Sequence, residues 1–243
     1  MSDTLILCYH AFSATWTADL SVVPGAFAEQ VERLKRAGYR GVTFTDAIQR
    51  RARGKEVAFT FDDAFDTVRT LAKPVLDDAG WPGTVYTVTS FAGEGGRPLC
   101  WDGIDHWRDG PDAGELASLG WDELRALRDE GWEVGSHTVS HPRLTLLPDA
   151  ELDAELIDSR EAVEHQLGEL CPSIAYPYGA VDERVVEAAG RAGYATGAAL
   201  PARWGEIGTL EWPRVGVYRP DDLRRFRMKT SRATRRAREL LKK

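Results

Sequence analysis

Two adjacent carboxylates, Asp62 and Asp63, stand where the apolar run 57–61 stops. A second pair of polar residues, His137 and His141, lies four positions apart. Two imidazoles at i and i+4 on a helical turn face the same way, which suits two ligands of one Zn²⁺ or Co²⁺ ion. With one carboxylate from the aspartate pair, they would form a catalytic metal site that keeps open positions for water and substrate.

The aspartate that does not bind the ion is available as a base. Neighbouring side chains at a strand end diverge in direction, so one carboxylate can bind the ion while the other accepts a proton from water. The ion lowers the pKa of that water toward about 7, and the base completes its activation. Each motif also has a structural alternative, because an aspartate pair can cap the following helix and an HxxxH pair can be a surface or core pair.

Short apolar runs alternate with amphipathic helical patterns along the whole chain, and these elements must bring the four side chains together. A strand followed by a helix, repeated about seven times, predicts a parallel sheet, and a closed or nearly closed β/α barrel fits this order best. The expected strands cover residues 4–10, 39–44, 56–61, 83–89, 132–137, 173–179, 194–199 and 212–218, and the expected helices cover 24–38, 45–51, 66–80, 121–131, 149–168 and 181–193.

The polar motifs share one position in this order. In a parallel β/α barrel the reacting groups lie at the C-terminal ends of the strands. The aspartate pair, the segment 135–141, the segment 176–179 and His10 each stand at the end of an expected strand. Structural roles can explain each motif alone, but they do not explain why all four gather on one rim.

Composition narrows the class of protein. The 243 residues are 43% hydrophobic, enough for one large core, and they predict a single domain over 1–243. The net charge of −7 gives no global attraction to nucleic acid or anionic lipid. Three widely spaced cysteines predict reduced thiols. The N-terminus lacks a basic leader, and no apolar run approaches the roughly 20 residues of a membrane span, so we expect a cytoplasmic protein without a transmembrane segment.

The charge is unevenly distributed along the chain. Residues 224–243 contain ten Lys or Arg and one Glu, a net charge of +9, so the rest of the chain carries −16. Apolar residues recur in this tail at helical spacing and predict a basic C-terminal helix over about 221–243. The helix either exposes a solvated basic face or contacts an acidic polymer, a membrane surface or a partner protein.

Three motifs resemble those of the polysaccharide deacetylases of the NodB-homology type, carbohydrate esterase family four: TFDD at 60–63, SHTVSH at 136–141 and YPYG at 176–179. The resemblance covers nearly the whole chain. It implies a distorted (β/α)7-type barrel with parallel strands and outer helices. It also implies metal-dependent removal of acetyl groups from N-acetylated sugars, whether poly- or oligosaccharides or a small amino sugar, with zinc expected and cobalt or nickel as alternatives.

The same resemblance assigns roles to single residues. It implies that Asp62 is the base and that Asp63, His137 and His141 hold the metal. It implies that Tyr178 contributes its backbone N–H to an oxyanion hole, which stabilises the tetrahedral intermediate.

The chain departs from the family pattern at three places. Ala64 replaces the usual Gly after the aspartate pair, Ala175 replaces an Arg that orients the base, and no LxH motif follows the last strand. One subgroup resembles the chain more closely, the permuted exopolysaccharide deacetylases similar to those acting on poly-N-acetylglucosamine, whose first strand ends in Tyr-His. Arg214 is expected to supply the missing cation, although a strand-end Arg could equally close a structural ion pair.

His10 is expected to be the general acid in place of the missing histidine. Amide hydrolysis needs such a group, because an amine leaves poorly unless it is protonated as the C–N bond breaks, and histidine is the side chain that titrates near neutral pH. Strand periodicity puts Ile6, Cys8 and His10 on one face. The alternative is a buried histidine hydrogen-bonded to a neighbouring loop.

Two other functions fit the sequence. One is a related metal-dependent hydrolase of a non-sugar amide, and the other is a catalytically inactive carbohydrate-binding member of the family. The intact ligand set argues against the inactive protein. Phe91, Trp101 and Trp107 in the loop 90–120 offer faces for sugar rings, although loop aromatics more often serve packing.

Overall fold

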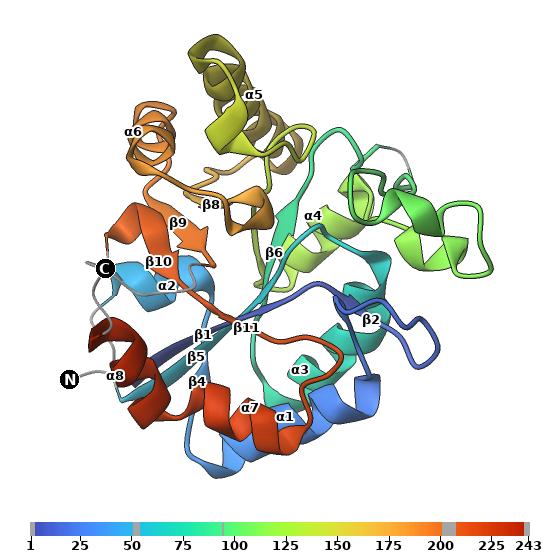
Figure 1. Cartoon of the computed structure of the whole chain (residues 1–243), viewed down its shortest axis with the longest axis vertical. Helices are drawn as coiled ribbons and strands as arrows, with labels where there is room; N and C mark the ends of the chain where they lie inside the picture. Colours follow the sequence, from blue (N-terminus) through green and yellow to red (C-terminus); the bar gives the residue numbers. More distant parts are fainter. Residues whose placement is uncertain (1–2, 51–53, 94, 201–207, 241–243) are drawn as a thin grey trace.

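The parallel strands form one continuous sheet. The computed structural model describes residues 3–50, 54–93, 95–200 and 208–240. In the sheet the strand order is β10-β9-β8-β7-β6-β5-β1-β11, and β4 pairs with β5 (Figure 1). The strands are β1 (Asp3–Tyr9), β4 (Arg40–Gly41), β5 (Lys55–Phe61), β6 (Thr84–Thr87), β7 (Glu133–Ser136), β8 (Ser173–Ala175), β9 (Thr196–Ala199), β10 (Trp212–Pro213) and β11 (Val215–Gly216); β2 (Ala11–Phe12) and β3 (Ser21–Val22) form a separate small sheet.

One short segment joins the two edges of the sheet. β10 pairs with β9 through Trp212 and Ala198, whereas β11 pairs with β1 through Val215 and Leu7. Only Arg214 separates β10 from β11, so residues 212–216 act as one strand that changes partners midway. The sheet is therefore a nearly closed barrel with seven strand positions, which confirms the predicted (β/α)7-type fold.

Helices cover the outside of this barrel where the sequence shows amphipathic patterns. They are α1 (Pro24–Arg36), α3 (Lys73–Ala79), α4 (Trp121–Asp129), α5 (Asp149–Leu167) and α6 (Glu183–Arg191). A π-helical turn, Val68–Ala72, precedes α3, and Pro74 lies in the first turn of α3, where its missing N–H costs least.

The alternation of side chains on β1 and β5 divides the core in two. Leu5 and Leu7 point outward to the helices, whereas Ile6 points into the barrel with Ala58 of β5. The short helix α2 (Phe44–Gln49) inserts Phe44 into this inner cluster. Its first backbone N–H donates to Thr84 Oγ1 at 2.8 Å, at the start of β6. Helix α2 thus closes the N-terminal end of the barrel and leaves the C-terminal end for chemistry.

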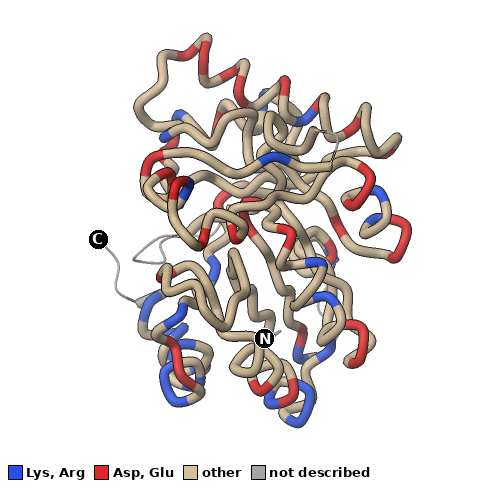
Figure 2. Tube along the Cα trace, turned by 90° about the vertical axis from the view of Figure 1, so that its right-hand side faces the viewer, with Lys and Arg blue, Asp and Glu red and all other residues tan. Residues whose placement is uncertain are grey.

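The basic tail is two helices rather than the single predicted one. α7 (Leu223–Thr230) ends before Ser231, and α8 (Arg232–Leu240) follows it. Ser231 Oγ accepts from the N–H of Thr234 at 3.1 Å, so this residue caps a new helix instead of continuing the old one. The last predicted positions, 241–243, lie outside the described residues. Lys and Arg are more numerous at the end of the molecule that holds α1, α7 and α8 (Figure 2).

Part of the tail's charge serves contacts within the protein. Arg235 is buried and donates to the carbonyl oxygen of Thr4 at 3.0 Å, which fastens α8 to β1. Among the described helices, none combines the length and the apolar character needed to cross a bilayer.

Candidate active site

Backbone strain is concentrated at the C-terminal rim of the barrel. Among the described residues, the non-glycine positions with positive φ are Asp63 (69°), Ala64 (54°), Thr138 (70°), His141 (64°) and Tyr178 (59°). All five follow β5, β7 or β8. A side chain in this region costs on the order of 1–3 kcal/mol and persists only where the surrounding structure imposes it, which is typical of functional sites. Ala64 therefore adopts the left-handed conformation that a glycine would adopt without strain.

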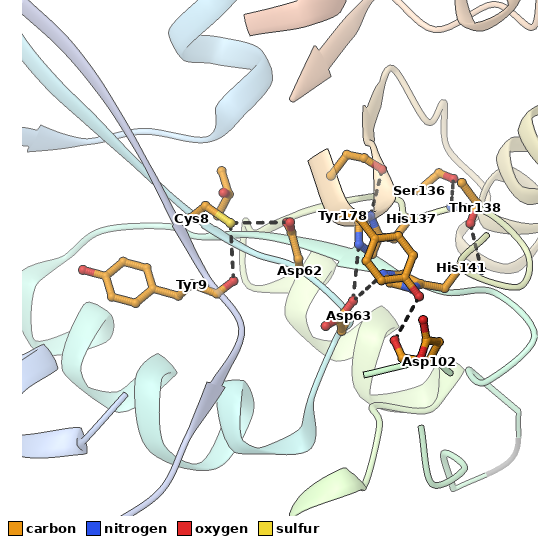
Figure 3. A network of polar contacts seen from close by, with 12 residues as sticks. Cys8, Tyr9, Asp62, Asp63, Asp102, Ser136, His137, Thr138, His141 and Tyr178 are labelled. Atoms are coloured by element: carbon orange, nitrogen blue, oxygen red, sulfur yellow. Dashed lines mark hydrogen bonds and ion pairs between the residues drawn. The ribbon is translucent and has the colours of Figure 1, made fainter. Parts of the chain in front are cut away.

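Asp63, His137 and His141 converge below this rim. Oδ1 of Asp63 lies 3.3 Å from Nε2 of His137 and 3.4 Å from Nε2 of His141 (Figure 3). All three side chains are buried, and their ligand atoms lie within 4.8 Å of one another. The structure thus brings together the three residues that the sequence assigns to a metal.

The loop that carries the two histidines is not the helical turn that the sequence predicts. Residues 137–141 follow β7 without helical structure, and both Thr138 and His141 have positive φ. Glu155 of α5 accepts from the backbone N–H groups of Val139 and Ser140 at 2.8 and 3.0 Å. A carboxylate from a distant helix therefore imposes the geometry that brings the imidazoles together.

The surroundings of the two histidines shift their pKa values in opposite directions. Nδ1 of His137 donates to the carbonyl oxygen of Ala175 at 2.8 Å, which directs Nε2 into the cluster. Burial opposes the charged form of His137, but its contact with Asp63 and the charge of Asp62 raise its pKa above the ordinary value. Burial lowers the pKa of His141 to about 3, so this imidazole is neutral at physiological pH.

The cluster fits a divalent cation on its own geometry. Oδ1 of Asp63 and Nδ1 of His141 are buried and accept or donate no hydrogen bond of normal geometry, a rare and costly condition for polar atoms. Two imidazole nitrogens and one carboxylate oxygen form the donor set of a catalytic Zn²⁺ site, which holds three protein ligands. A cation at this position would satisfy the carboxylate oxygen, which contacts the two imidazoles but accepts no hydrogen bond of normal geometry.

Asp62 faces away from this cluster and binds Arg214. Both guanidinium Nη atoms donate to the carboxylate, Nη1 to Oδ1 at 2.6 Å and Nη2 to Oδ2 at 2.7 Å. Both residues are buried. Burial opposes ionisation of Asp62, but the positive charge and hydrogen bonds of Arg214 outweigh it and hold the pKa of Asp62 well below its usual range. The two adjacent carboxylates thus have separate partners, as the divergence of strand-end side chains predicts.

Cys8 also contacts Asp62, which the sequence analysis did not foresee. Its Sγ donates to Oδ2 of Asp62 at 3.4 Å, and burial raises the pKa of the thiol well above its ordinary value. The thiol therefore stays protonated and acts as a donor. The strand periodicity that places Cys8 and His10 on one face was the available signal.

His10 lies on the wall of a cleft of about 320 Å³. The floor of this cleft contains Asp62, Asp63, His137 and His141. The ring of His10 stacks on Tyr218 with 6.2 Å between ring centroids and 27° between the planes. Nδ1 of His10 is buried and has no hydrogen-bond partner among the described residues. Nδ1 of His10 therefore gives no support to the alternative role for His10, that of a buried histidine hydrogen-bonded to a neighbouring loop.

Tyr178 and Trp101 form the opposite wall of the cleft. The centre of the Tyr178 ring lies 4.6 Å from the centre of the His141 ring, and the centre of the Trp101 ring lies 4.1 Å from it. The hydroxyl of Tyr178 donates to the carbonyl oxygen of Asp102 at 3.2 Å, which ties the loop after β8 to the loop after β6. Of the three loop aromatics considered for sugar contact, only Trp101 lines the cleft.

Comparisons with known proteins agree with this architecture. A family model described as polysaccharide deacetylase matches residues 49–197, more than half of the chain. YxkH of Bacillus subtilis (strain 168) is 24% identical over 197 residues, 79% of this chain and 62% of that protein. Peptidoglycan-N-acetylglucosamine deacetylase PgdA of Listeria monocytogenes is 37% identical over 84 residues, 35% of this chain and 16% of that protein. The chain thus spans less than two thirds of the length of either relative.

Two solved structures share the fold over nearly the whole chain. The Streptococcus pyogenes deacetylase PplD superimposes with a TM-score of 0.77 and 22% identity, covering 94% of this chain and 98% of that one. IcaB from Ammonifex degensii gives a TM-score of 0.76 and 22% identity, covering 96% and 98%. This likeness shows a shared fold, and the matched family model over residues 49–197 shows that the chain belongs to the polysaccharide deacetylase family.

Proposed function

We propose that the protein is a metal-dependent hydrolase that removes acetyl groups from N-acetylated sugars in a poly- or oligosaccharide. The observation that carries this proposal is the convergence of Asp63, His137 and His141 beside the separately held Asp62 on the floor of one cleft. Family membership supports the reaction class, and the Tyr9-His10 pair at the end of the first strand, which resembles that of the poly-N-acetylglucosamine deacetylases, supports an N-acetyl rather than another acyl group.

Asp63, His137 and His141 would hold the cation, and the donor set favours Zn²⁺ over harder ions. When bound, the cation supplies Lewis acidity, which polarises a carbonyl group and lowers the pKa of water. His137 contributes through its Nε2, because its Nδ1 proton is engaged by Ala175. The positive φ of Asp63 and His141 holds both side chains in place before substrate arrives.

Asp62 would accept the proton of the attacking water. The guanidinium of Arg214 keeps it ionised, so the basic form is present over the whole physiological pH range. A carboxylate held this strongly is a weak base, and it acts here by position as much as by proton affinity. Arg214 is in this account a positioning residue, which fixes both oxygens of Asp62 in one orientation.

His10 and Tyr178 would act on the other atoms of the amide. His10 lines the cleft on the side of Asp62 and would protonate the leaving nitrogen as the C–N bond breaks. The backbone N–H of Tyr178, in a left-handed conformation at the rim, would stabilise the negative charge on the acetyl oxygen. The proton accepted by Asp62 would thus come from the attacking water, and the proton donated by His10 would go to the leaving nitrogen.

Mass spectrometry and acetate release test this proposal together. Metal-depleted protein is reloaded with Zn²⁺, Co²⁺ or Ni²⁺ and incubated with N-acetylglucosamine oligomers, while released acetate is measured and each product is weighed. We expect acetate release only from reloaded protein, with one acetyl group lost per turnover. A loaded protein that binds the oligomers without releasing acetate would identify a binding member of the family, and one that hydrolyses only non-sugar amides would identify the alternative hydrolase.

A further inference from the structure

A second cavity lies next to the cleft, on the far side of Tyr218. Its volume is about 490 Å³, within the usual range of ligand-binding pockets. Tyr218 lines both hollows, so one side chain forms their common boundary. The remaining walls come from Asp19, before β3, and from α7, which contributes Arg225 and Met228.

The surroundings hold this boundary residue in place. The buried carboxylate of Asp221 accepts from the backbone N–H of Tyr218 at 2.9 Å and from Nζ of Lys229 at 2.5 Å. Nζ of Lys229 also lies 5.3 Å from the centre of the Tyr218 ring. A Cβ at Gly216 would lie 2.8 Å from this ring, so the glycine makes room for it. The cavity wall is therefore formed before any ligand binds.

A second contact joins the two chain segments that line the cavity. The backbone N–H of Arg219 donates to the carbonyl oxygen of Asp19 at 2.7 Å. Arg225, which lines the cavity, donates to the carbonyl oxygen of Pro220 at 3.0 Å, and this bond uses one of its five N–H donors. Loops from the two ends of the chain thus form one preorganised surface.

The chemistry of the lining suits a sugar ring. Tyr218 and Met228 offer apolar area, and Met228 is 59% exposed, so its side chain is accessible to a ligand. Burial raises the pKa of Tyr218 to about 12, so its hydroxyl remains a hydrogen-bond donor. Asp19 and Arg225 add a carboxylate and a guanidinium that can bind hydroxyl groups. An apolar face with a few convergent polar groups is the usual composition of small-molecule sites.

We propose that this cavity is a second saccharide subsite, which binds the sugar next to the one that is deacetylated. The inference rests on the proposed function, because it takes the cleft as the place of the reacting sugar. The lining residues lie at position 19 and from 218 to 229, outside the segment 49–197 that matches the family model. The subsite is thus a feature of this chain's terminal segments, and it makes the substrate a chain of sugars rather than a free amino sugar.

Chain-length dependence tests the subsite. The zinc-loaded protein is given N-acetylglucosamine as the monomer and as the tetramer, and kcat/KM is measured for each from acetate release. We expect a clear preference for the tetramer in the unmodified protein. The combined substitution Arg225→Ala and Met228→Ala should lower the tetramer-to-monomer ratio of kcat/KM by on the order of tenfold, since it removes one charged hydrogen bond and one apolar contact. The change should reside in KM for the tetramer, because no reacting atom is touched.

Two matched controls remove the same kinds of side chain elsewhere. Arg224→Ala removes an exposed arginine of α7 that does not line the cavity, and Leu170→Ala removes an apolar side chain that is 77% exposed near the start of β8. Both should keep the ratio of the unmodified protein. An equal kcat/KM for monomer and tetramer, or a ratio that survives the combined substitution, would overturn the subsite. Absence of acetate release from both substrates would overturn the proposed function itself, and the subsite with it.

Discussion

Glu133 and Asp63 are carboxylates at opposite ends of one barrel, and their surroundings differ sharply. Glu133 begins β7 at the end that α2 closes. It accepts hydrogen bonds from the backbone N–H and the hydroxyl of Thr45 at 2.8 and 2.6 Å, and from the hydroxyl of Ser173 at 2.5 Å. This carboxylate is fully engaged by the protein and fastens α2 to the sheet.

Asp63 has no comparable set of donors. Its Oδ1 is buried without a hydrogen bond of normal geometry, and its backbone lies in the left-handed region. Burial of polar groups is therefore common to both ends of the barrel, but unsatisfied atoms and backbone strain coincide only at the C-terminal end of the described structure. The comparison teaches that a ligand site is recognised by what the protein leaves unpaired rather than by polar residues alone.

The largest expected effect comes from removing a ligand at the strained end. His137→Ala removes one of the three proposed metal ligands. Metal affinity should fall by more than the roughly 10- to 100-fold that is typical when a residue hydrogen-bonded to a ligand is lost, and acetate release should become undetectable. Metal content after dialysis and kcat/KM are the measurements. His165→Ala, an exposed histidine on α5, is the matched control. A His137→Ala protein with full metal content would remove this residue from the ligand set.

A smaller loss is expected when the neighbouring carboxylate is changed. Asp62→Asn keeps the size of the side chain but removes the base, so the rate should fall by at least about 10², within the range for a lost general base. Metal content should be unchanged, because Asp62 is bound by Arg214 and not by the histidines. Asp66→Asn, which alters a half-buried aspartate paired with Arg69, is the control. Equal metal loss in Asp62→Asn and Asp63→Asn would mean that the two roles are shared.

The general acid has a distinct signature in the pH profile. With an N-acetyl substrate, the unmodified protein should lose activity at high pH, because the group that protonates the leaving amine is then deprotonated. His10→Ala should be slower by roughly 10², the lower part of the usual range for a proton donor, and should lack this high-pH limb. His106→Ala, in the exposed loop, should behave like the unmodified protein. An unchanged rate and profile in His10→Ala would assign the acid elsewhere.

Metal affinity should depend on pH through one histidine. Contact with Asp63 raises the pKa of His137 above its ordinary value of about 6.5, so a cation must displace a proton from this residue near neutral pH. The pKa of His141 is lowered to about 3, so His141 releases none. The dissociation constant, measured by competition with a chromophoric chelator, should fall about tenfold per pH unit until the raised pKa is passed. A pH-independent affinity between about pH 6 and about pH 7 would contradict a protonated His137.

The smallest effect on catalysis is expected at the closed end. Glu133→Gln removes the charge that accepts from Thr45 and Ser173, and it should lower the free energy of unfolding by about 1–3 kcal/mol. Chemical denaturation measures this change. Metal affinity and kcat/KM of the folded protein should stay the same. A parallel loss of metal would show that the two ends of the barrel are coupled and would break the comparison.

The fold and the convergence of Asp63, His137 and His141 could be predicted because their signals are local. Period-two apolar runs place Ile6 on the inner face, and the repeated order of strand and helix predicts the barrel. The aspartate pair and the two histidines lie in short motifs. Because parallel strands present their C-terminal ends on one rim, the spacing along the chain is enough to bring these motifs together.

The remaining features depend on contacts between distant segments. The turn that carries the histidines is not helical, because Glu155 of α5 binds its backbone N–H groups and two of its residues adopt positive φ. The contact of Cys8 with Asp62 spans 54 residues; strand periodicity indicates which face Cys8 occupies, but it does not name the partner on another strand. The break between α7 and α8 at Ser231 has a local signal, because serine is a common helix-capping residue. The basic residues on both sides of Ser231 favour one continuous helix instead, and this pattern led to the wrong prediction.

The segment 212–216, which changes partners at Arg214, has a consequence for the order of folding. Arg214 and Asp62 are 152 residues apart, and the ion pair forms only when this last strand enters the gap between β9 and β1. Until then the Asp62 carboxylate lacks its counter-charge, so a partly folded chain gains little by burying it. Joining such distant segments is intrinsically slow. Closure of the barrel and formation of the Asp62–Arg214 ion pair are thus one kinetic event, and intermediates that lack it should be open, with Asp62 still without its counter-charge.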